Sequence, residues 1–129
     1  MTVELRMLAL TVVLGFVHVA LSAHFVTKQY GLDWNVGPRD VQMPPLGELA
    51  GRLRRAQYNF FETFPLFAAA TLIAVVAGKQ GALTYWGSQL YFWGRVLYLP
   101  LYATGIPIVR SIVWTAATAG IFLTLSSLL

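Results

Sequence analysis

The chain has 129 residues, of which 57% are hydrophobic and only 11% are charged, and it carries a net charge of +4 and no cysteine. A soluble domain of this size keeps much of its surface in water and usually has about a quarter of its residues charged, so the composition excludes an ordinary soluble fold and favours lipid as the solvent. The absence of cysteine excludes disulfides, thiolate metal sites and a cysteine nucleophile, and any thiol chemistry must use a thiol from outside the chain.

Apolar runs predict four membrane-spanning helices. The first, at about residues 5–27, contains no charged residue from Met7 to Thr27, and at 1.5 Å per residue this run is about 31 Å long, enough for the hydrocarbon core. The run is longer than the apolar part of a typical signal peptide and no small-x-small cleavage site follows, so we expect it to be retained. The other spans are expected at about 46–77, 83–102 and 108–129.

One long polar stretch interrupts these spans. Residues 28–45 are rich in glycine, proline and charged residues, which predicts an exposed irregular loop. The second span starts with polar turns and should stand out of the membrane on one side. We see no internal repeat or linker, so the expected fold is one all-α domain over residues 1–129, a four-helix membrane bundle.

The basic residues predict the orientation of the bundle. On the side of the long loop lie Lys28, Arg39, Arg52, Arg54, Arg55 and Arg110, whereas the other side has only Arg6 and Lys79. Because Lys and Arg collect on the cytoplasmic side, the loop should be cytoplasmic and both termini should face away from the cytoplasm. The net charge is thereby explained without the basic stripe of a nucleic-acid-binding surface, so we expect no nucleic acid partner.

Four polar residues share one face of the second span. The spacing of Arg52, Arg55, Asn59 and Glu62 is three, four and three residues, which matches one helical face. An ionisable residue in the middle of a span costs roughly 2.5–3.5 kcal/mol, so such residues persist when they are paired, in contact with water or near the headgroups. The plain structural interpretation is an ion pair near the headgroups.

The third span repeats the pattern with Tyr91, Arg95, Tyr98 and Tyr102. Arg95 lies too deep to reach the headgroups, so we expect it to pair with Glu62, the one deep acidic residue. Together the two faces offer guanidinium, amide, carboxylate and phenol groups, which would suit a small zwitterionic ligand.

The remaining aromatic and histidine residues fit ordinary structural roles. The tryptophans fit anchors at the membrane interface; they are Trp34, Trp86, Trp93 and Trp114. His18 and His24 are six residues apart and cannot bind one metal ion together, so we expect both to be hydrogen-bonded packing residues and expect no metal.

Two segments carry a family resemblance. The sequences RAQYNFFETFP in the second span and YFWGRVLYLPLYATGIPIVRS around the third resemble the MAPEG family, membrane-associated proteins of eicosanoid and glutathione metabolism. The order of elements is similar along the whole chain, and the GPRD loop resembles the bacterial branch. The resemblance implies a homotrimer of four-helix bundles, in the bacterial inner membrane, that binds glutathione in clefts between subunits. Small residues that would let neighbouring subunits approach closely are Ala68, Ala69, Ala70 and Gly94.

The resemblance also implies roles for single residues. By motif position, Arg55 would bind a glutathione carboxylate, Asn59 the peptide backbone and Glu62 the α-amino group. The other side chains that the resemblance places around glutathione are Lys28, Gln57, Arg95, Tyr98 and Tyr102, with Lys28 reaching the ligand from a neighbouring subunit.

Arg110 and Ser111 match the family's thiolate-stabilising arginine and its neighbour, and would be catalytic. The implied enzyme is a glutathione transferase or peroxidase acting on lipophilic electrophiles. One alternative is a membrane protein that binds glutathione or serves as a scaffold without catalysis. Another is a small four-helix exporter, but such exporters need a carboxylate within the first span, and Glu4 lies at its end.

Overall fold

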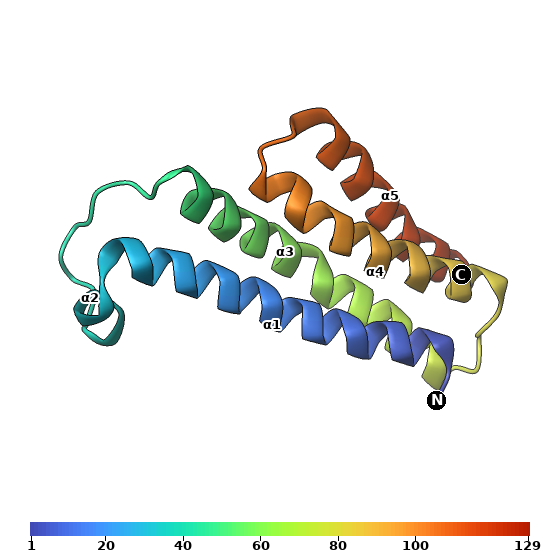
Figure 1. The fold of residues 1–129 in the computed structure, drawn as a ribbon. Coiled ribbons are helices and arrows are strands. Elements are labelled where there is room, and N and C mark those ends of the chain that lie inside the picture. Colours follow the sequence, from blue (N-terminus) through green and yellow to red (C-terminus); the bar gives the residue numbers. More distant parts are fainter.

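The computed structural model covers residues 1–129 and contains four long helices and one short one (Figure 1). The helices are α1 (Val3–Tyr30), α2 (Leu32–Val36), α3 (Glu48–Val76), α4 (Ala82–Ala103) and α5 (Pro107–Ser126). There is no β-strand, and the predicted all-α bundle is confirmed. Both termini lie at one end of the bundle, and the long loop lies at the other (Figure 1).

Three helices are long and apolar enough to cross a membrane, namely α1, α3 and α5. The fourth, α4, has 22 residues but falls short by its composition. This helix contacts all three other long helices. Its polar residues therefore face protein instead of lipid, as the burial of Thr84, Ser88 and Arg95 shows. Of the four spans predicted from the apolar runs, α4 is the one that does not reach the hydropathy of a membrane-crossing helix.

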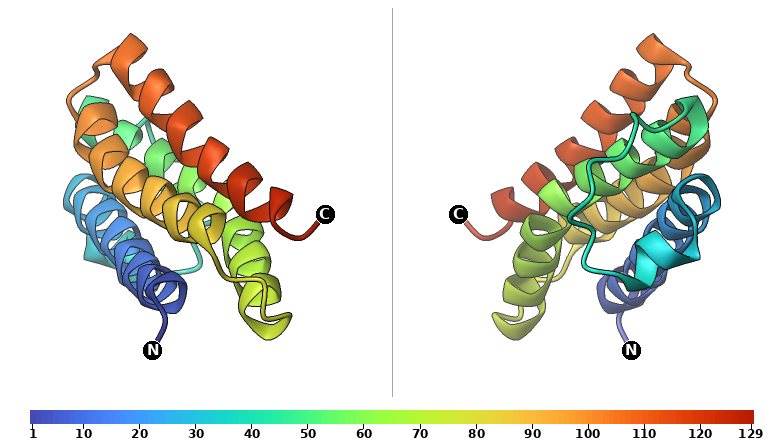
Figure 2. Two further views of the ribbon diagram at one scale, coloured as in Figure 1. Left: turned by 90° about the vertical axis from the view of Figure 1, so that its right-hand side faces the viewer. Right: turned by 90° about the vertical axis from the view of Figure 1, so that its left-hand side faces the viewer.

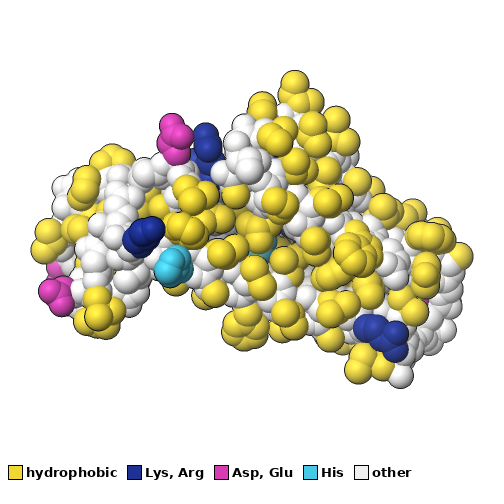
Figure 3. Space-filling model, viewed as in Figure 1, with side chains coloured by type: hydrophobic (Ala, Val, Ile, Leu, Met, Phe, Trp, Pro, Cys, Tyr) yellow, Lys and Arg dark blue, Asp and Glu magenta, His cyan; other side chains and the backbone are white.

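The outside of the bundle is apolar. Phe16, Leu66 and Phe122 are 71%, 60% and 66% exposed, and they lie on three different helices. Figure 3 shows hydrophobic side chains covering most of one face, with the few charged groups near its ends. A contiguous apolar surface of this extent marks contact with lipid or with other subunits.

Helices α4 and α5 pack in close contact. A Cβ atom on Gly94 would lie 2.8 Å from the Cβ of Ala117, so the helices can approach this closely only because residue 94 is glycine. Ala117 of the same chain thus fills the space over Gly94, which the sequence pattern assigns to contact with a neighbouring subunit. Gly94 is half-buried, and its part in contacts between subunits stays a prediction. Ala70 is buried in the core of the chain, at 3% exposure.

The long loop is more ordered than its composition predicted. Helix α1 continues to Tyr30, and the short α2 follows and lies against the end of α1 (Figure 2, right). Asn35 donates a hydrogen bond to the Thr27 hydroxyl at 2.6 Å. Gln29 donates to the carbonyl of Pro45 at 3.0 Å and accepts from the Gly47 N–H at 2.8 Å. These bonds attach both ends of the loop to α1.

At the opposite end, Glu4 joins α1 to α4. Its carboxylate accepts a 2.7 Å hydrogen bond from the Thr84 hydroxyl in the first turn of α4, and the Glu4 side chain is buried. A carboxylate at the start of two helices is also favoured by the positive ends of their dipoles.

Candidate functional site

Two adjoining cavities lie between α3, α4 and α5, and they share Arg110. One has a volume of about 390 Å³ and is lined by Asn59, Tyr98, Arg110, Ser111, Trp114 and Thr115. The other has a volume of about 290 Å³ and is lined by Arg52, Arg55, Tyr102, Gly105, Pro107 and Arg110. We call the two together the polar groove.

Helical periodicity explains why these residues meet. Arg55 and Asn59 are four residues apart on α3, and Tyr98 and Tyr102 are four apart on α4, so each pair lies on one face of its helix. Pro107 occupies the first turn of α5, where its missing N–H costs nothing, and thereby fixes where that helix begins. Arg110 then faces the groove one turn later.

Tyr102 lies between two cations of the groove. Its hydroxyl accepts a 3.2 Å hydrogen bond from Nε of Arg55, and the guanidinium carbon of Arg110 lies 4.6 Å from its ring centroid. Cation–π contacts of this kind orient a guanidinium while leaving its N–H groups free for a ligand. The structure thus presents two oriented cations in one groove.

Arg95 lies beneath the groove and is fully buried, at 0% exposure. Its Nη1 donates a 2.8 Å hydrogen bond to Oδ1 of Asn59, and its guanidinium carbon lies 4.3 Å from the Tyr98 ring centroid. The predicted ion pair with Glu62 is wrong, because Arg95 donates to Asn59 instead, and the one ion pair of the structure joins Arg52 to Glu48 at 3.8 Å. Glu62 is exposed and lines neither cavity of the groove.

The histidines are partly as expected. His18 is a packing residue, with 1% exposure and its ring stacked on Phe60 at 4.7 Å, but neither ring nitrogen has a hydrogen-bond partner. The predicted hydrogen bonding of His18 is therefore wrong, because Phe60 and not a polar group covers its ring. The prediction that His24 is a packing residue is also wrong, because its side chain is exposed and contacts only the ring of the adjacent Phe25 edge-on. No three His, Asp or Glu side chains come together as a metal site would require.

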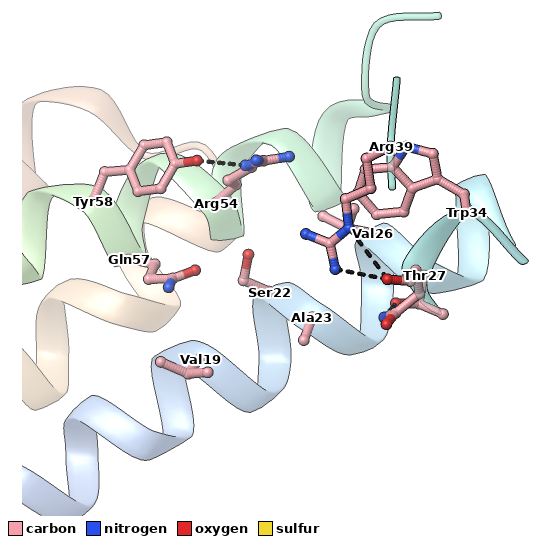
Figure 4. Close-up of a pocket in the computed structure, with 11 residues that line it drawn as sticks. Val19, Ser22, Ala23, Val26, Thr27, Trp34, Arg39, Arg54, Gln57 and Tyr58 are labelled. Atoms are coloured by element: carbon pink, nitrogen blue, oxygen red, sulfur yellow. Dashed lines mark hydrogen bonds between the residues drawn. The ribbon is translucent and has the colours of Figure 1, made fainter. Parts of the chain in front are cut away.

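Lys28 and Gln57 do not line the polar groove. Lys28 is exposed near the end of α1. Gln57 lines a separate cavity of about 190 Å³ between α1, α3 and the long loop, together with Arg54 and Tyr58 (Figure 4). Within one chain these two residues are thus apart from the other predicted site residues, and their role in a neighbouring subunit stays a prediction.

The structure adds residues that the sequence reasoning left out of the site. Arg52 had been placed on the correct helical face but not in the ligand site, and Trp114 had been assigned to the membrane interface. The spacing of four between Arg110 and Trp114 was the available signal, since it places both on one face of α5.

An apolar exterior, with polar and basic side chains gathered in one groove between α3, α4 and α5, defines this chain as an integral membrane protein. The MAPEG family model matches residues 7–129, and the chain belongs to this family, as the resemblance predicted. The MAPEG fold is a four-helix membrane bundle, and the family comprises membrane transferases and peroxidases related to glutathione, which its members typically use. No match to a curated protein or to a solved structure was found.

Proposed function

We propose that this protein is a glutathione transferase or peroxidase that activates the glutathione thiol for attack on lipophilic electrophiles. The observation that supports this function is the polar groove, in which Arg55, Asn59, Tyr98, Tyr102 and Arg110 line two adjoining cavities within an apolar bundle. A water-soluble thiol and an acceptor dissolved in lipid could meet there. We place the protein in the bacterial inner membrane with the long loop in the cytoplasm, where glutathione is supplied.

The chemistry of the groove matches that of glutathione. Arg55 would bind a carboxylate through charge-assisted hydrogen bonds. Asn59 accepts from Arg95 through its oxygen, so its amide N–H groups stay available for a peptide carbonyl. Glu62, nearly one turn further along α3, would bind the ammonium group. In a homotrimer, Lys28 and Gln57 of a neighbouring subunit would complete the site.

Arg110 would stabilise the reactive form of the thiol. A free thiol has a pKa of about 8.5 and is mostly protonated at neutral pH, whereas a nearby guanidinium lowers that pKa and raises the thiolate fraction. Ser111 lines the same cavity, and its hydroxyl, which donates to the Pro107 carbonyl at 3.3 Å, could turn to donate a hydrogen bond to the thiolate. The thiol proton passes to water, and the thiolate attacks an electrophilic carbon, where the new C–S bond forms as a leaving group departs or as a conjugated double bond takes up the electron pair. With a peroxide, the thiolate attacks one oxygen and the O–O bond breaks, which gives an alcohol and a sulfenic acid of glutathione; a second glutathione converts this acid to glutathione disulfide and water.

The first test is isothermal titration of the detergent-solubilised protein with glutathione. Binding heat supports the proposal, and no heat at millimolar glutathione contradicts it. The same preparation also decides between catalysis and binding alone. Bound glutathione that shows no thiolate absorbance at neutral pH would favour the non-catalytic alternative.

Replacing Arg110 by Ala tests the catalytic role. We expect the affinity for glutathione to stay within a few-fold, because Arg55, Asn59 and Glu62 bind the rest of the ligand. Turnover should fall much more, since the charge on sulfur contributes little to ground-state binding but sets the population of the nucleophile. The thiolate titration of bound glutathione should move toward that of the free thiol. Full activity in Arg110→Ala would contradict this role.

A further inference from the structure

A second groove runs along the outer side of the bundle, between α4 and α5. We call it the outer groove; it has a volume of about 480 Å³ and is shaped by Trp86, Gln89, Trp93, Leu97, Val113 and Ala116, none of which is charged. Helical periodicity places Trp86, Trp93 and Leu97 on the side of α4 opposite to the buried Arg95. These three residues are 60%, 54% and 55% exposed, so no other part of the chain covers the outer groove.

The polar groups of the outer groove are hydrogen-bond donors. Nε1 of Trp93 donates a 2.9 Å hydrogen bond to Oε1 of Gln89, which fixes the Gln89 amide and engages its acceptor oxygen. The amide N–H groups of Gln89 and the indole N–H of Trp86 find no acceptor in the chain. Donors without acceptors are costly in lipid. The molecule that covers the outer groove should therefore offer acceptors.

Gln89 lies near the boundary between the headgroups and the hydrocarbon core. Glu4 and Thr84 are joined by a hydrogen bond at the end of the bundle where α1 and α4 both begin (Figure 1), so they lie at the same depth. Arg6 follows Glu4 by two residues and is exposed, and a charged side chain facing lipid has to reach the headgroups. Gln89 lies five residues, or roughly 7.5 Å, beyond Thr84, and its side chain leans back toward the start of α4. Its amide donors therefore lie where the ester groups of a glycerolipid join headgroup and chains.

The length of the outer groove matches one leaflet of the membrane. Trp86 and Leu97 are eleven residues apart, which corresponds to roughly 16 Å along α4. Half of a hydrocarbon core of about 30 Å is about 15 Å. Past Gln89 the lining is apolar, and the small size of Gly94 and Ala116 leaves room for one acyl chain between the two helices.

We propose that the outer groove binds one glycerolipid of the leaflet on the side of the termini, with an ester carbonyl on the Gln89 amide and an acyl chain along the apolar part of the groove. Such a lipid supplies acceptors at the depth of Gln89 and a flexible chain of leaflet length. A helix of another protein matches less well, because its backbone carbonyls are already paired within the helix. The site lies apart from the polar groove and does not depend on glutathione chemistry.

The experiment combines two lipids with two variants and their matched controls. Gln89→Leu removes the donors, and Gln80→Leu makes the same change in the exposed connection before α4. Ala116→Phe fills the groove, and Ala119→Phe makes the same change at an exposed position of α5 outside it. The lipids are dioleoyl phosphatidylcholine and its diether analogue, which has the same headgroup and chains but no ester carbonyls. Native mass spectrometry of the whole chain in detergent measures the affinity of the first lipid bound per subunit, and size-exclusion chromatography checks the assembly of each variant.

We expect the parent to bind the ester lipid roughly 3- to 10-fold more tightly than the ether lipid, as one hydrogen bond implies. Gln89→Leu should bind both lipids within about 2-fold of each other, because neither can then use its acceptors. Ala116→Phe should weaken both by roughly 10-fold or more, since displacing two methylene groups from the groove already costs that much. Gln80→Leu and Ala119→Phe should behave as the parent.

Equal affinity of the parent for the two lipids would overturn the hydrogen bond to Gln89 and the proposed site with it. Lipid binding by Ala116→Phe that equals the parent would show that the first lipid lies elsewhere. A changed oligomeric state in Ala116→Phe, but not in Ala119→Phe, would assign the outer groove to a contact between subunits instead of a lipid. Glutathione binding by the parent is unaffected by any of these outcomes, so they test this inference separately from the proposed function.

Discussion

Arg95 and Asn59 form the polar contact on which the floor of the groove depends. The guanidinium is buried in the bundle, and among its three nitrogens only Nη1 has a hydrogen-bond partner, the Asn59 oxygen. The rings of Tyr98 and Phe60 lie at 4.3 and 5.5 Å from its central carbon and replace part of the lost hydration. Because its oxygen is fixed in this way, the Asn59 amide is oriented before any ligand binds.

This arrangement predicts non-additive effects of substitution. Asn59→Leu should lower the midpoint of thermal unfolding clearly, because it leaves a buried cation without its one partner, at a cost of about 1.5–3 kcal/mol. Arg95→Met in addition should restore much of the loss, since replacing both polar partners by apolar groups is nearly neutral. Fluorescence-detected chromatography after heating in detergent measures these midpoints.

The single variant Arg95→Met serves as the control, because it removes the cation but leaves Asn59 free to bind water in the groove. If Asn59→Leu unfolds at the same midpoint as the parent, the hydrogen bond between Arg95 and Asn59 does not contribute to stability. If the double variant is less stable than either single one, the two residues act independently.

The sequence alone could show which site residues share one face of a helix. It could not show which residues of the other helices they contact. Spacing of three and four placed Arg55, Asn59 and Glu62 on one face of α3, which helical geometry alone requires. Spacing does not fix how that helix is rotated against α4. This rotation decides whether Arg95 bonds to Asn59 or to Glu62, and in the structure it donates a hydrogen bond to Asn59.

At the scale of helices, α3 and α4 each contact the other three long helices. Helix α4 also encloses polar side chains, since Thr84, Ser88 and Arg95 are buried. A helix with several polar side chains in an apolar chain is expected to pack inside the bundle, since polar groups of a membrane protein must be kept out of lipid. Which small residues serve contacts within the chain could not be predicted, because Gly94 is equally suited to contact α5 or another subunit.

The contact between α4 and α5 should be sensitive to one methyl group. Gly94→Ala would bring two Cβ atoms to 2.8 Å, so the helices must move apart. We expect a lower midpoint of thermal unfolding, by the roughly 1–3 kcal/mol typical of overpacking. Ala117→Gly should rescue part of the loss in the double variant by removing the opposing methyl group.

Gly81→Ala is the matched control for this pair. It makes the same chemical change at the start of α4, where an added Cβ would meet nothing within 4 Å and φ is extended at −179°. Because Gly81 is the N-cap of α4, where Ala is less favoured than Gly, we expect at most a loss of about 1 kcal/mol. A loss in Gly94→Ala no larger than that in Gly81→Ala would show that close packing against Ala117 does not limit stability.

For the whole molecule, the exposure of Glu62 is the observation that points beyond one chain. Glu62 is the middle residue of α3, and its side chain is exposed and forms no ion pair. A charged residue facing lipid at this depth costs roughly 2.5–3.5 kcal/mol. A ligand ammonium, a neighbouring subunit or both must therefore cover it, and the exposed apolar residues of α3 beside it, including Leu66 and Ile73, suit a subunit interface.

We therefore predict a homotrimer, in which each polar groove is closed by the α1 and α3 helices of a neighbour carrying Lys28 and Gln57. Native mass spectrometry in a mild detergent should show trimers. Glu62→Gln should keep the trimer, because glutamine retains the volume and hydrogen-bonding capacity, but should weaken glutathione binding by roughly 10-fold or more through loss of the charge that meets the ammonium. Chiefly monomers or dimers in the parent would contradict the trimer. Loss of assembly in Glu62→Gln would instead assign this carboxylate to the subunit interface, because a residue needed only for the ligand leaves the interface intact.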